Sequence, residues 1–239
     1  MTTITSPDNP QLKEIRKLTQ RRRQRERAGR FVAEGEDLLA AADAAGWEPV
    51  QRFCAAGSGL AGIEVEPKLL SQASGIASGT RAVAIYAERF IEAPLGPVCV
   101  YLHGVGDPGN VGTILRGASA FGAGSVAFGP DTADPYSPKA VRASMGAVFE
   151  VPLTRIDDPA DLEQLPGTTV ALVADQGVPL AEAELAGSVT LLVGSERDGL
   201  PAGIVSGADT VARIPITSHS LNAAMAATVA LYELSRMAR

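Results

Sequence analysis

The sequence predicts an α/β protein whose larger, carboxyl-terminal part is built on a mostly parallel sheet. Apolar runs recur between residues 98 and 216, and polar or helix-favouring segments separate them. The runs are continuously apolar rather than alternating, which is typical of strands buried on both faces by helices. With 239 residues, 46% of them hydrophobic, the chain has room for one or two domains. The runs are VCVYLH (98–103), SVAFGP (125–130), FEVPLTRI (149–156), TVALVAD (169–175), VTLLVGSE (189–196) and TVARIPI (210–216).

A smaller α/β domain is expected before these runs. The segment FIEAPLGP (90–97) carries two prolines and a glycine, which favours a boundary there and gives domains 1–93 and 94–239. The expected elements of the first domain are helices near 9–28, 36–45 and 67–74 and strands within 30–35, 50–57 and 81–90. A closing helix over 220–239 places Leu221, Met225, Val229 and Tyr232 on one stripe, as in an amphipathic helix.

The distribution of charge points to a polyanionic partner. The net charge of the chain is −6, but residues 10–30 hold nine Lys or Arg against two Glu, so this segment is +7 and the rest is −13. A solvated basic helix would explain the pattern as well, but the density of arginine, which binds phosphate through two parallel hydrogen bonds, favours RNA or DNA. The candidate RNA-binding residues are Lys13, Arg16, Lys17, Arg21, Arg22, Arg23, Arg25 and Arg30.

Other classes of protein are disfavoured by what the sequence lacks. It has no run near the roughly 18 apolar residues of a membrane span, and its amino terminus does not resemble a secretion signal, so we expect a cytoplasmic protein. Cys54 and Cys99 are expected to be buried free thiols. With only His103 and His219 besides them, no metal site is expected, and His219 is expected to be structural.

The loop HGVGDPGN (103–110) contains G-x-G-x-x-G at Gly104, Gly106 and Gly109, between a strand and a helix. With Asp131 about 20 residues further on, this spacing is compatible with a dinucleotide site. Pro108 argues against that interpretation because it removes an amide donor from the turn. An NAD(P)-dependent oxidoreductase therefore stays as an alternative.

Four ordered segments carry a more specific resemblance. They are GVGDPGNVGTILRGASAFGAGSVAFGP (104–130), SPKAVRASMGAVFEVP (137–152), LLVGSERDGLP (191–201) and IPITSHSLNAAMAATVALYE (214–233). The chain resembles the SpoU/TrmH-type RNA 2′-O-ribose methyltransferases of the SPOUT superfamily, and NPQLKEIRKL and FVAEGEDLLAAA resemble their substrate-binding domain. It departs from the pattern at Ser195, where many members carry Asn, and at Ala223, where a β-branched residue commonly follows Asn222.

The resemblance implies transfer of a methyl group from S-adenosylmethionine to a ribose 2′-hydroxyl of ribosomal RNA, with transfer RNA as an alternative substrate. It also implies a homodimer and a carboxyl-terminal trefoil knot. A non-catalytic RNA-binding protein of the same fold stays open. The implied catalytic residues are Arg116, Asn110, Glu196, Ser220 and Asn222, and the implied cofactor-binding residues are Gly194, Ser195, Glu196, Gly199, Ile214, Ile216, Leu221 and Asn222. The resemblance implies that Arg116 is the base; because arginine holds its proton tightly, a phosphate clamp is the alternative role expected for it.

Overall fold

The computed structural model describes residues 3–75, 79–217 and 220–237. These residues form two compact units. The first unit holds the chain up to Glu88 together with Asp134–Phe149, and the second unit holds Arg89–Ala133 and the chain from Glu150 onward. His219 lies outside the described residues.

The first unit contains a four-stranded sheet in the order β1-β4-β2-β3. Strand β4 pairs antiparallel with β1 and β2, and β3 pairs parallel with β2. The strands are β1 (Arg30–Glu34), β2 (Gln51–Ala55), β3 (Ile63–Val65) and β4 (Ala82–Ala87). The helices are α1 (Pro10–Gln20), α2 (Arg22–Ala28), α3 (Glu36–Ala44), α4 (Pro67–Ser74), α6 (Pro138–Ser144) and α7 (Ala147–Glu150).

The basic segment forms two helices, where the sequence predicts one over 9–28. The Asn9 side chain accepts a hydrogen bond from the Gln11 amide and caps α1, as expected for this residue type. The chain then breaks at Arg21, whose backbone is extended with φ −131° and ψ 114°. Helix α2 ends at Gly29, which adopts the left-handed conformation. The basic side chains therefore project from two short helices.

Apolar side chains pack on both faces of this sheet. One face carries Val32, Phe53, Val83 and Ile85, which pack with residues of α1 and α4 such as Leu12 and Leu70. The other face carries an aromatic cluster in which the ring of Phe31 lies 4.4 Å from that of Tyr136 and 5.9 Å from that of Phe149. Trp47 joins the cluster at 5.2 Å from Phe149, and its indole nitrogen donates to the Phe149 carbonyl.

The division of the chain differs from the continuous 94–239 domain expected from the sequence. The segment Asp134–Phe149 belongs to the first unit, although the chain before and after it belongs to the second. Its Tyr136 and Phe149 side chains pack against Phe31 of the first unit. Gly146 adopts φ +100°, and a Cβ atom at this position would lie 2.6 Å from the Cβ of Ala41 on α3. Only glycine allows this approach without displacement.

A buried ion pair ties the same segment to the basic helices. Arg25 is 4% exposed, and its guanidinium donates to Asp134 at 2.8 Å and to the Leu18 carbonyl at 2.7 Å. The other carboxylate oxygen of Asp134 accepts the Tyr136 amide. Buried charges are tolerated when they are paired and hydrogen-bonded in this way.

The second unit contains a seven-stranded sheet in the order β7-β6-β5-β10-β8-β11-β9, and every pairing is parallel. The parallel sheet expected from the continuous apolar runs is therefore confirmed. The strands are β5 (Val98–Leu102), β6 (Ser125–Phe128), β7 (Leu153–Arg155), β8 (Thr168–Val173), β9 (Val178–Pro179), β10 (Val189–Val193) and β11 (Thr210–Arg213). Of the predicted run 149–156, only 153–155 is a strand, because Phe149 belongs to α7.

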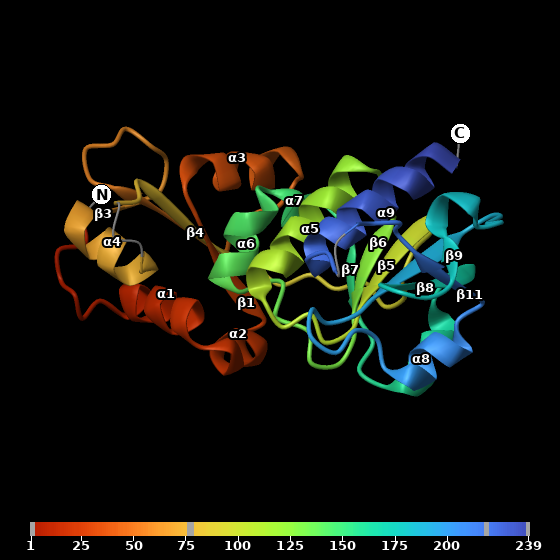
Figure 1. Cartoon of the computed structure of the whole chain (residues 1–239). Coiled ribbons are helices and arrows are strands. Elements are labelled where there is room, and N and C mark those ends of the chain that lie inside the picture. Colours follow the sequence, from red (N-terminus) through yellow and green to blue (C-terminus); the bar gives the residue numbers. More distant parts are fainter. Residues whose placement is uncertain (1–2, 76–78, 218–219, 238–239) are drawn as a thin grey trace. The chain divides into compact units, whose positions relative to one another are not determined.

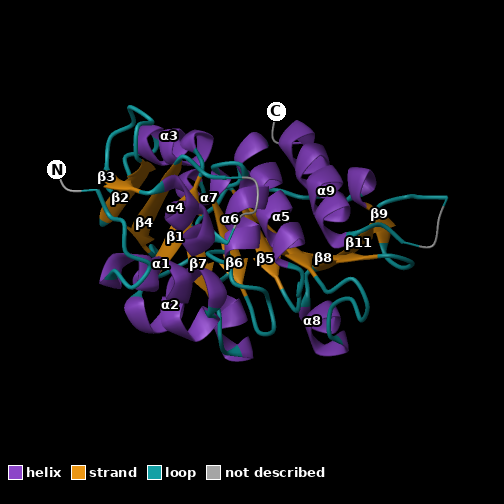
Figure 2. Cartoon of the chain, turned by 90° about the vertical axis from the view of Figure 1, so that its left-hand side faces the viewer, coloured by secondary structure: helices purple, strands orange, loops and turns teal. Residues whose placement is uncertain are grey.

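Helices α5 (Pro108–Ala120) and α9 (Ala223–Met237) cover one face of this sheet, and α8 (Ala202–Gly207) lies on the other (Figures 1 and 2). Two 3₁₀ turns, η1 (Pro159–Gln164) and η2 (Leu180–Glu182), complete the unit. Among the described residues, no helix is long and apolar enough to cross a membrane.

Helices α5 and α9 pack closely side by side (Figure 1). A Cβ atom at Gly117 of α5 would lie 3.1 Å from the Thr228 hydroxyl of α9. The buried face of α9 consists of Ala223, Ala224, Ala227, Ala230, Leu231 and Leu234. Small residues thus allow the two helices to pack closely. Three residues of the stripe predicted from the sequence face solvent: Met225 is 58%, Val229 38% and Tyr232 47% exposed.

Candidate active site

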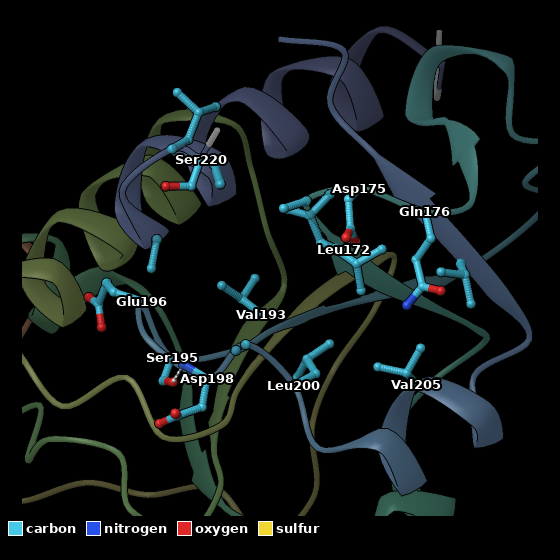
Figure 3. A pocket seen from close by; sticks show the side chains of 18 of the residues that line it. Leu172, Asp175, Gln176, Val193, Ser195, Glu196, Asp198, Leu200, Val205 and Ser220 are labelled. Carbon is cyan, nitrogen blue, oxygen red and sulfur yellow. Dashed lines mark hydrogen bonds between the residues drawn. The ribbon is translucent and has the colours of Figure 1, made fainter. Parts of the chain in front are cut away.

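A cavity of about 980 Å³ opens at the carboxyl ends of β10, β8 and β11, which are neighbours in the sheet. Three segments line it, one at the end of each of these strands: residues 172–176, residues 193–202, and the described residues Ile214, Ile216, Ser220 and Leu221. Figure 3 shows Leu172 and Asp175 on one side of the cavity and the Ser195–Asp198 segment on another. The carboxyl ends of parallel strands are where open α/β sheets bind ligands.

The segment Gly194–Gly199 folds into a tight turn. Ser195 and Gly199 exchange both backbone hydrogen bonds, at 3.2 and 3.1 Å, and the Ser195 hydroxyl accepts the Asp198 amide at 3.0 Å. Gly199 has φ +67°, and a Cβ atom at Gly194 would lie 2.2 Å from the Gly199 carbonyl carbon. Glycine is required at Gly194 for the turn to close, and the turn presents Glu196 beside the cavity.

Three predicted catalytic residues form one hydrogen-bond network. The Asn110 amide group donates to the Glu196 carboxylate, and its carbonyl oxygen accepts from the Asn222 amide group at 3.1 Å. The Asn222 carbonyl oxygen in turn accepts the backbone amides of Ala224 and Met225 at the start of α9. The network joins the amino ends of α5 and α9 to the turn.

Helix α5 begins at this network because Asp107 caps it. The Asp107 carboxylate accepts the backbone amides of Gly109 and Asn110 at 2.6 and 3.2 Å, and Pro108 occupies the first helical position. Both features are typical of helix starts. The Gly104–Gly109 loop therefore builds a helix start, and its glycines are not among the described residues that line the cavity.

Arg116 lies two turns further along α5. Its side chain is exposed, and it makes no hydrogen bond or ion pair within the described part of the chain. It is also not among the described residues that line the cavity. A single chain thus does not bring Arg116 to the cavity that the other candidates surround.

The remaining predicted site residues lie as follows. Seven of the eight predicted cofactor-binding residues line the cavity: Gly194, Ser195, Glu196, Gly199, Ile214, Ile216 and Leu221. Asn222 does not line it but joins the network described above. Ser220, predicted as catalytic, is also a lining residue.

Sequence reasoning missed the segment Leu172–Gln176, which forms one wall of the cavity. The signal was available, because this segment follows the buried run TVALVAD, and the carboxyl ends of parallel strands lie at one edge of the sheet.

Tyr101 and His103 lie at the carboxyl end of β5, the neighbour of β10 in the sheet. Tyr101 at the end of β5 hydrogen-bonds His103 at 3.1 Å, and burial raises the pKa of Tyr101 to about 12. Its phenol therefore stays protonated at neutral pH, which excludes it as a general base. Among the residues described, no group of three or more His, Cys, Asp or Glu could hold a metal ion.

The basic segment separates into paired and unpaired side chains. Lys13 pairs with Asp8, Arg22 with Glu26 and Arg30 with Glu14, and Arg16 donates to the Pro7 carbonyl. The prediction that Arg25 binds RNA is wrong. Its guanidinium is buried against Asp134 and is not available to a phosphate. The exposed residues Lys17, Arg21, Arg23 and Arg27 make no side-chain hydrogen bond or ion pair with any described residue.

Comparison with known proteins identifies both parts of the chain. Residues 97–232 match the SpoU rRNA methylase family, and residues 9–88 match the MRM3-like substrate-binding domain. The chain is 33% identical over 135 residues to the 23S rRNA (guanosine(2553)-2′-O)-methyltransferase RlmP of Bacillus subtilis. That match covers 54% of this chain and 54% of RlmP, so the chain spans about half the length of this relative.

Two further matches extend along almost the whole chain. An uncharacterized tRNA/rRNA methyltransferase of Synechocystis is 31% identical over 98% of this chain and 93% of its own. The crystal structure of an AdoMet-bound rRNA methyltransferase from Sinorhizobium meliloti superposes with a TM-score of 0.88, at 31% identity, over 99% of this chain and 98% of that one. By its sequence, its parallel sheet and the cavity at the edge of that sheet, the chain belongs to the SpoU rRNA methylase family.

Proposed function

We propose that this protein binds S-adenosylmethionine in the 980 Å³ cavity and methylates a ribose 2′-hydroxyl of RNA, with ribosomal RNA as the substrate. The observation that carries the proposal is the cavity itself, built from three loops in a chain that matches an AdoMet-bound rRNA methyltransferase over nearly its full length. The names of the relatives favour ribosomal over transfer RNA. We place the reaction in the cytoplasm, where such a substrate is found.

The residues that line the cavity fit this cofactor. The cavity volume is within the range of about 300–1,000 Å³ that small-molecule sites have. Apolar side chains, including Leu172, Val193 and Ile214, suit an adenine ring, and the turn at Gly194 lets the backbone approach a ligand closely. Carboxylates at the rim suit ribose hydroxyls and a cation.

The bound cofactor would supply a methyl group on a sulfonium, which needs no metal activation. The chain must therefore position the target hydroxyl and help to remove its proton. Asn110, Glu196 and Asn222 hold one another in place, and Ser220 lies at the cavity, so these side chains orient the ribose. Arg116 has one of two roles: it removes the proton, or it stabilises the developing alkoxide and a neighbouring phosphate. The second role is favoured because arginine keeps its own proton.

The exposed position of Arg116 supports a homodimer. Arg116 projects from α5, and Met225, Val229 and Tyr232 form an exposed apolar stripe on the adjacent helix α9. Such a stripe favours a second copy of the chain. In that dimer each Arg116 would serve the cavity of the other protomer. Sedimentation of the intact protein is expected to give a dimer, and Val229→Asp is expected to give monomers with much lower activity. A monomeric wild type would contradict this arrangement.

The trefoil knot is proposed for the second unit. Strand β10 lies between β5 and β8, and α9 returns to pack on α5, about 100 residues earlier in the sequence. Together with the family resemblance, these neighbours lead us to propose that the chain passes through its own loop here. Generic folding rules alone would not suggest it.

The unpaired basic residues are proposed as the RNA-binding face. Each phosphate contact releases counterions, so it contributes about 0.7–0.9 to the slope of log affinity against log salt. A variant with Arg21, Arg23 and Arg27 changed to Gln is expected to lower this slope by about 2–3 and to weaken RNA binding. The matched variant changes the paired residues Lys13, Arg22 and Arg30 to Gln, and its slope is expected to fall by less than about 1. Equal losses in both variants would contradict the assignment.

The activity itself is tested by mapping ribose methylation on total RNA with and without the gene. One ribosomal 2′-O-methyl group is expected to disappear with the gene and to return when the purified protein and S-adenosylmethionine are added. Loss of a transfer-RNA methyl group would replace the proposed substrate with the alternative. Binding of NAD(P) instead of S-adenosylmethionine would favour the oxidoreductase. RNA binding without any methylation would indicate a non-catalytic protein.

A further inference from the structure

The wall formed by β8 contributes a carboxylate that the hydrogen-bond network does not use. Asp175 lines the cavity from the segment after β8, and its side chain is exposed. It makes no hydrogen bond or ion pair with any residue that the structure describes. Glu196, in contrast, is held by the amide group of Asn110. Asp175 is therefore available to a ligand.

The charges that line the cavity are unbalanced. Among the described lining residues, three carboxylates (Asp175, Glu196 and Asp198) stand against one guanidinium, that of Arg197, which gives a net charge of −2. Figure 3 shows Asp175 beside Leu172, on the wall across the cavity from Glu196 and Asp198. Negative charge on two sides of a cavity with apolar walls concentrates the field inside it and favours a cationic ligand.

We infer that Asp175 determines specificity for the charge of the ligand and so distinguishes S-adenosylmethionine from the product S-adenosylhomocysteine. This inference rests on the proposed function. The two nucleosides share the adenosine and the amino acid end, and they differ by one methyl group and the positive charge of the sulfonium. A carboxylate without a partner among the described residues responds to that charge difference. It favours entry of the charged cofactor and departure of the uncharged thioether.

The test measures binding heats of both nucleosides to the intact wild-type protein and to Asp175→Asn. The substitution keeps the shape of the side chain and removes its charge. We expect affinity for S-adenosylmethionine to fall about 5–10-fold and affinity for S-adenosylhomocysteine to change less than about twofold, and the difference to shrink at high salt. Sinefungin carries an ammonium group in place of the methylated sulfonium, so its affinity is expected to fall as that of S-adenosylmethionine does.

Glu184→Gln is the matched control, because Glu184 is an exposed carboxylate of the same unit outside the lining of the cavity. It is expected to leave all three affinities unchanged. If the wild type binds neither nucleoside, the proposed function fails. If the wild type binds both and Asp175→Asn weakens both equally, or neither, the inference about Asp175 is overturned while the proposed function stands.

Discussion

Charged side chains of this protein occur in two contrasting settings, as buried ion pairs in the first unit and at an open cavity in the second. In the first unit, Arg25 is buried against Asp134, and Arg142 pairs with the buried carboxylate of Glu34. In the second unit, Glu196 and Asp175 lie at an open cavity, and Arg116 is exposed without a partner among the described residues. Paired charges hold the first unit together, and charges at the open edge of the second are available to a ligand.

This difference teaches that residue type alone does not assign a role. Arg25 and Arg116 are both arginines on helices, and both were candidates for contact with the substrate. Burial gives Arg25 a structural role, because a guanidinium that leaves a buried carboxylate would leave that charge uncompensated.

Arg116→Ala is expected to reduce methyl transfer by about a hundredfold to ten-thousandfold, because it removes the group that we propose stabilises the developing alkoxide. Affinity for S-adenosylmethionine is expected to stay nearly unchanged, since Arg116 does not line the cavity of its own chain. Single-turnover rates and calorimetry measure the two effects separately. The control is Thr113→Ala on the same exposed side of α5. A near-wild-type rate in Arg116→Ala would remove this residue from the mechanism.

Arg25→Ala is expected to lower the free energy of unfolding by about 3–5 kcal/mol, because it leaves the buried Asp134 carboxylate without its partner. The matched variant Arg23→Ala removes an exposed arginine of the same helix and should cost less than about 0.5 kcal/mol. Denaturant unfolding followed by circular dichroism compares the two. Equal stabilities would show that the buried pair contributes no more than a surface charge.

The smallest expected effect is the contribution of Glu34 to the pH dependence of the free energy of unfolding, and its sign follows from the direction of the pKa shift. Burial raises the pKa of Glu34, while the hydrogen bond from Arg142 partly offsets the shift. The folded protein therefore takes up this proton at a higher pH than the unfolded chain does, so acidification stabilises the folded state through this group. The free energy of unfolding of the wild type, relative to Glu34→Gln, should rise as pH falls through the raised pKa. It should level off near 4.5, the ordinary value of the group. A relative fall in the same window would contradict the sign.

Much of the architecture could be predicted because local patterns determine it. Continuous apolar runs such as residues 189–193 indicated the parallel sheet, and the resemblance to a known family indicated two of the three segments that line the cavity. The partner of Arg25 could not be predicted, since Asp134 lies 109 residues away and no periodicity links them. The outward stripe of α9 was equally hidden, because the alanines that bury its other face form a weaker hydrophobic signal than Met225 or Tyr232.

Because Asp134–Phe149 belongs to the first unit, the chain cannot be cut at one position into two separately folded fragments. A fragment that begins at Arg89 would keep Tyr136 and Phe149 but lose Phe31 and Trp47, so it would expose aromatic rings to water and tend to aggregate. An exchange of the amino-terminal unit between relatives would have to carry both pieces together. The first unit is therefore encoded by two separate stretches of the gene, and both must be exchanged together.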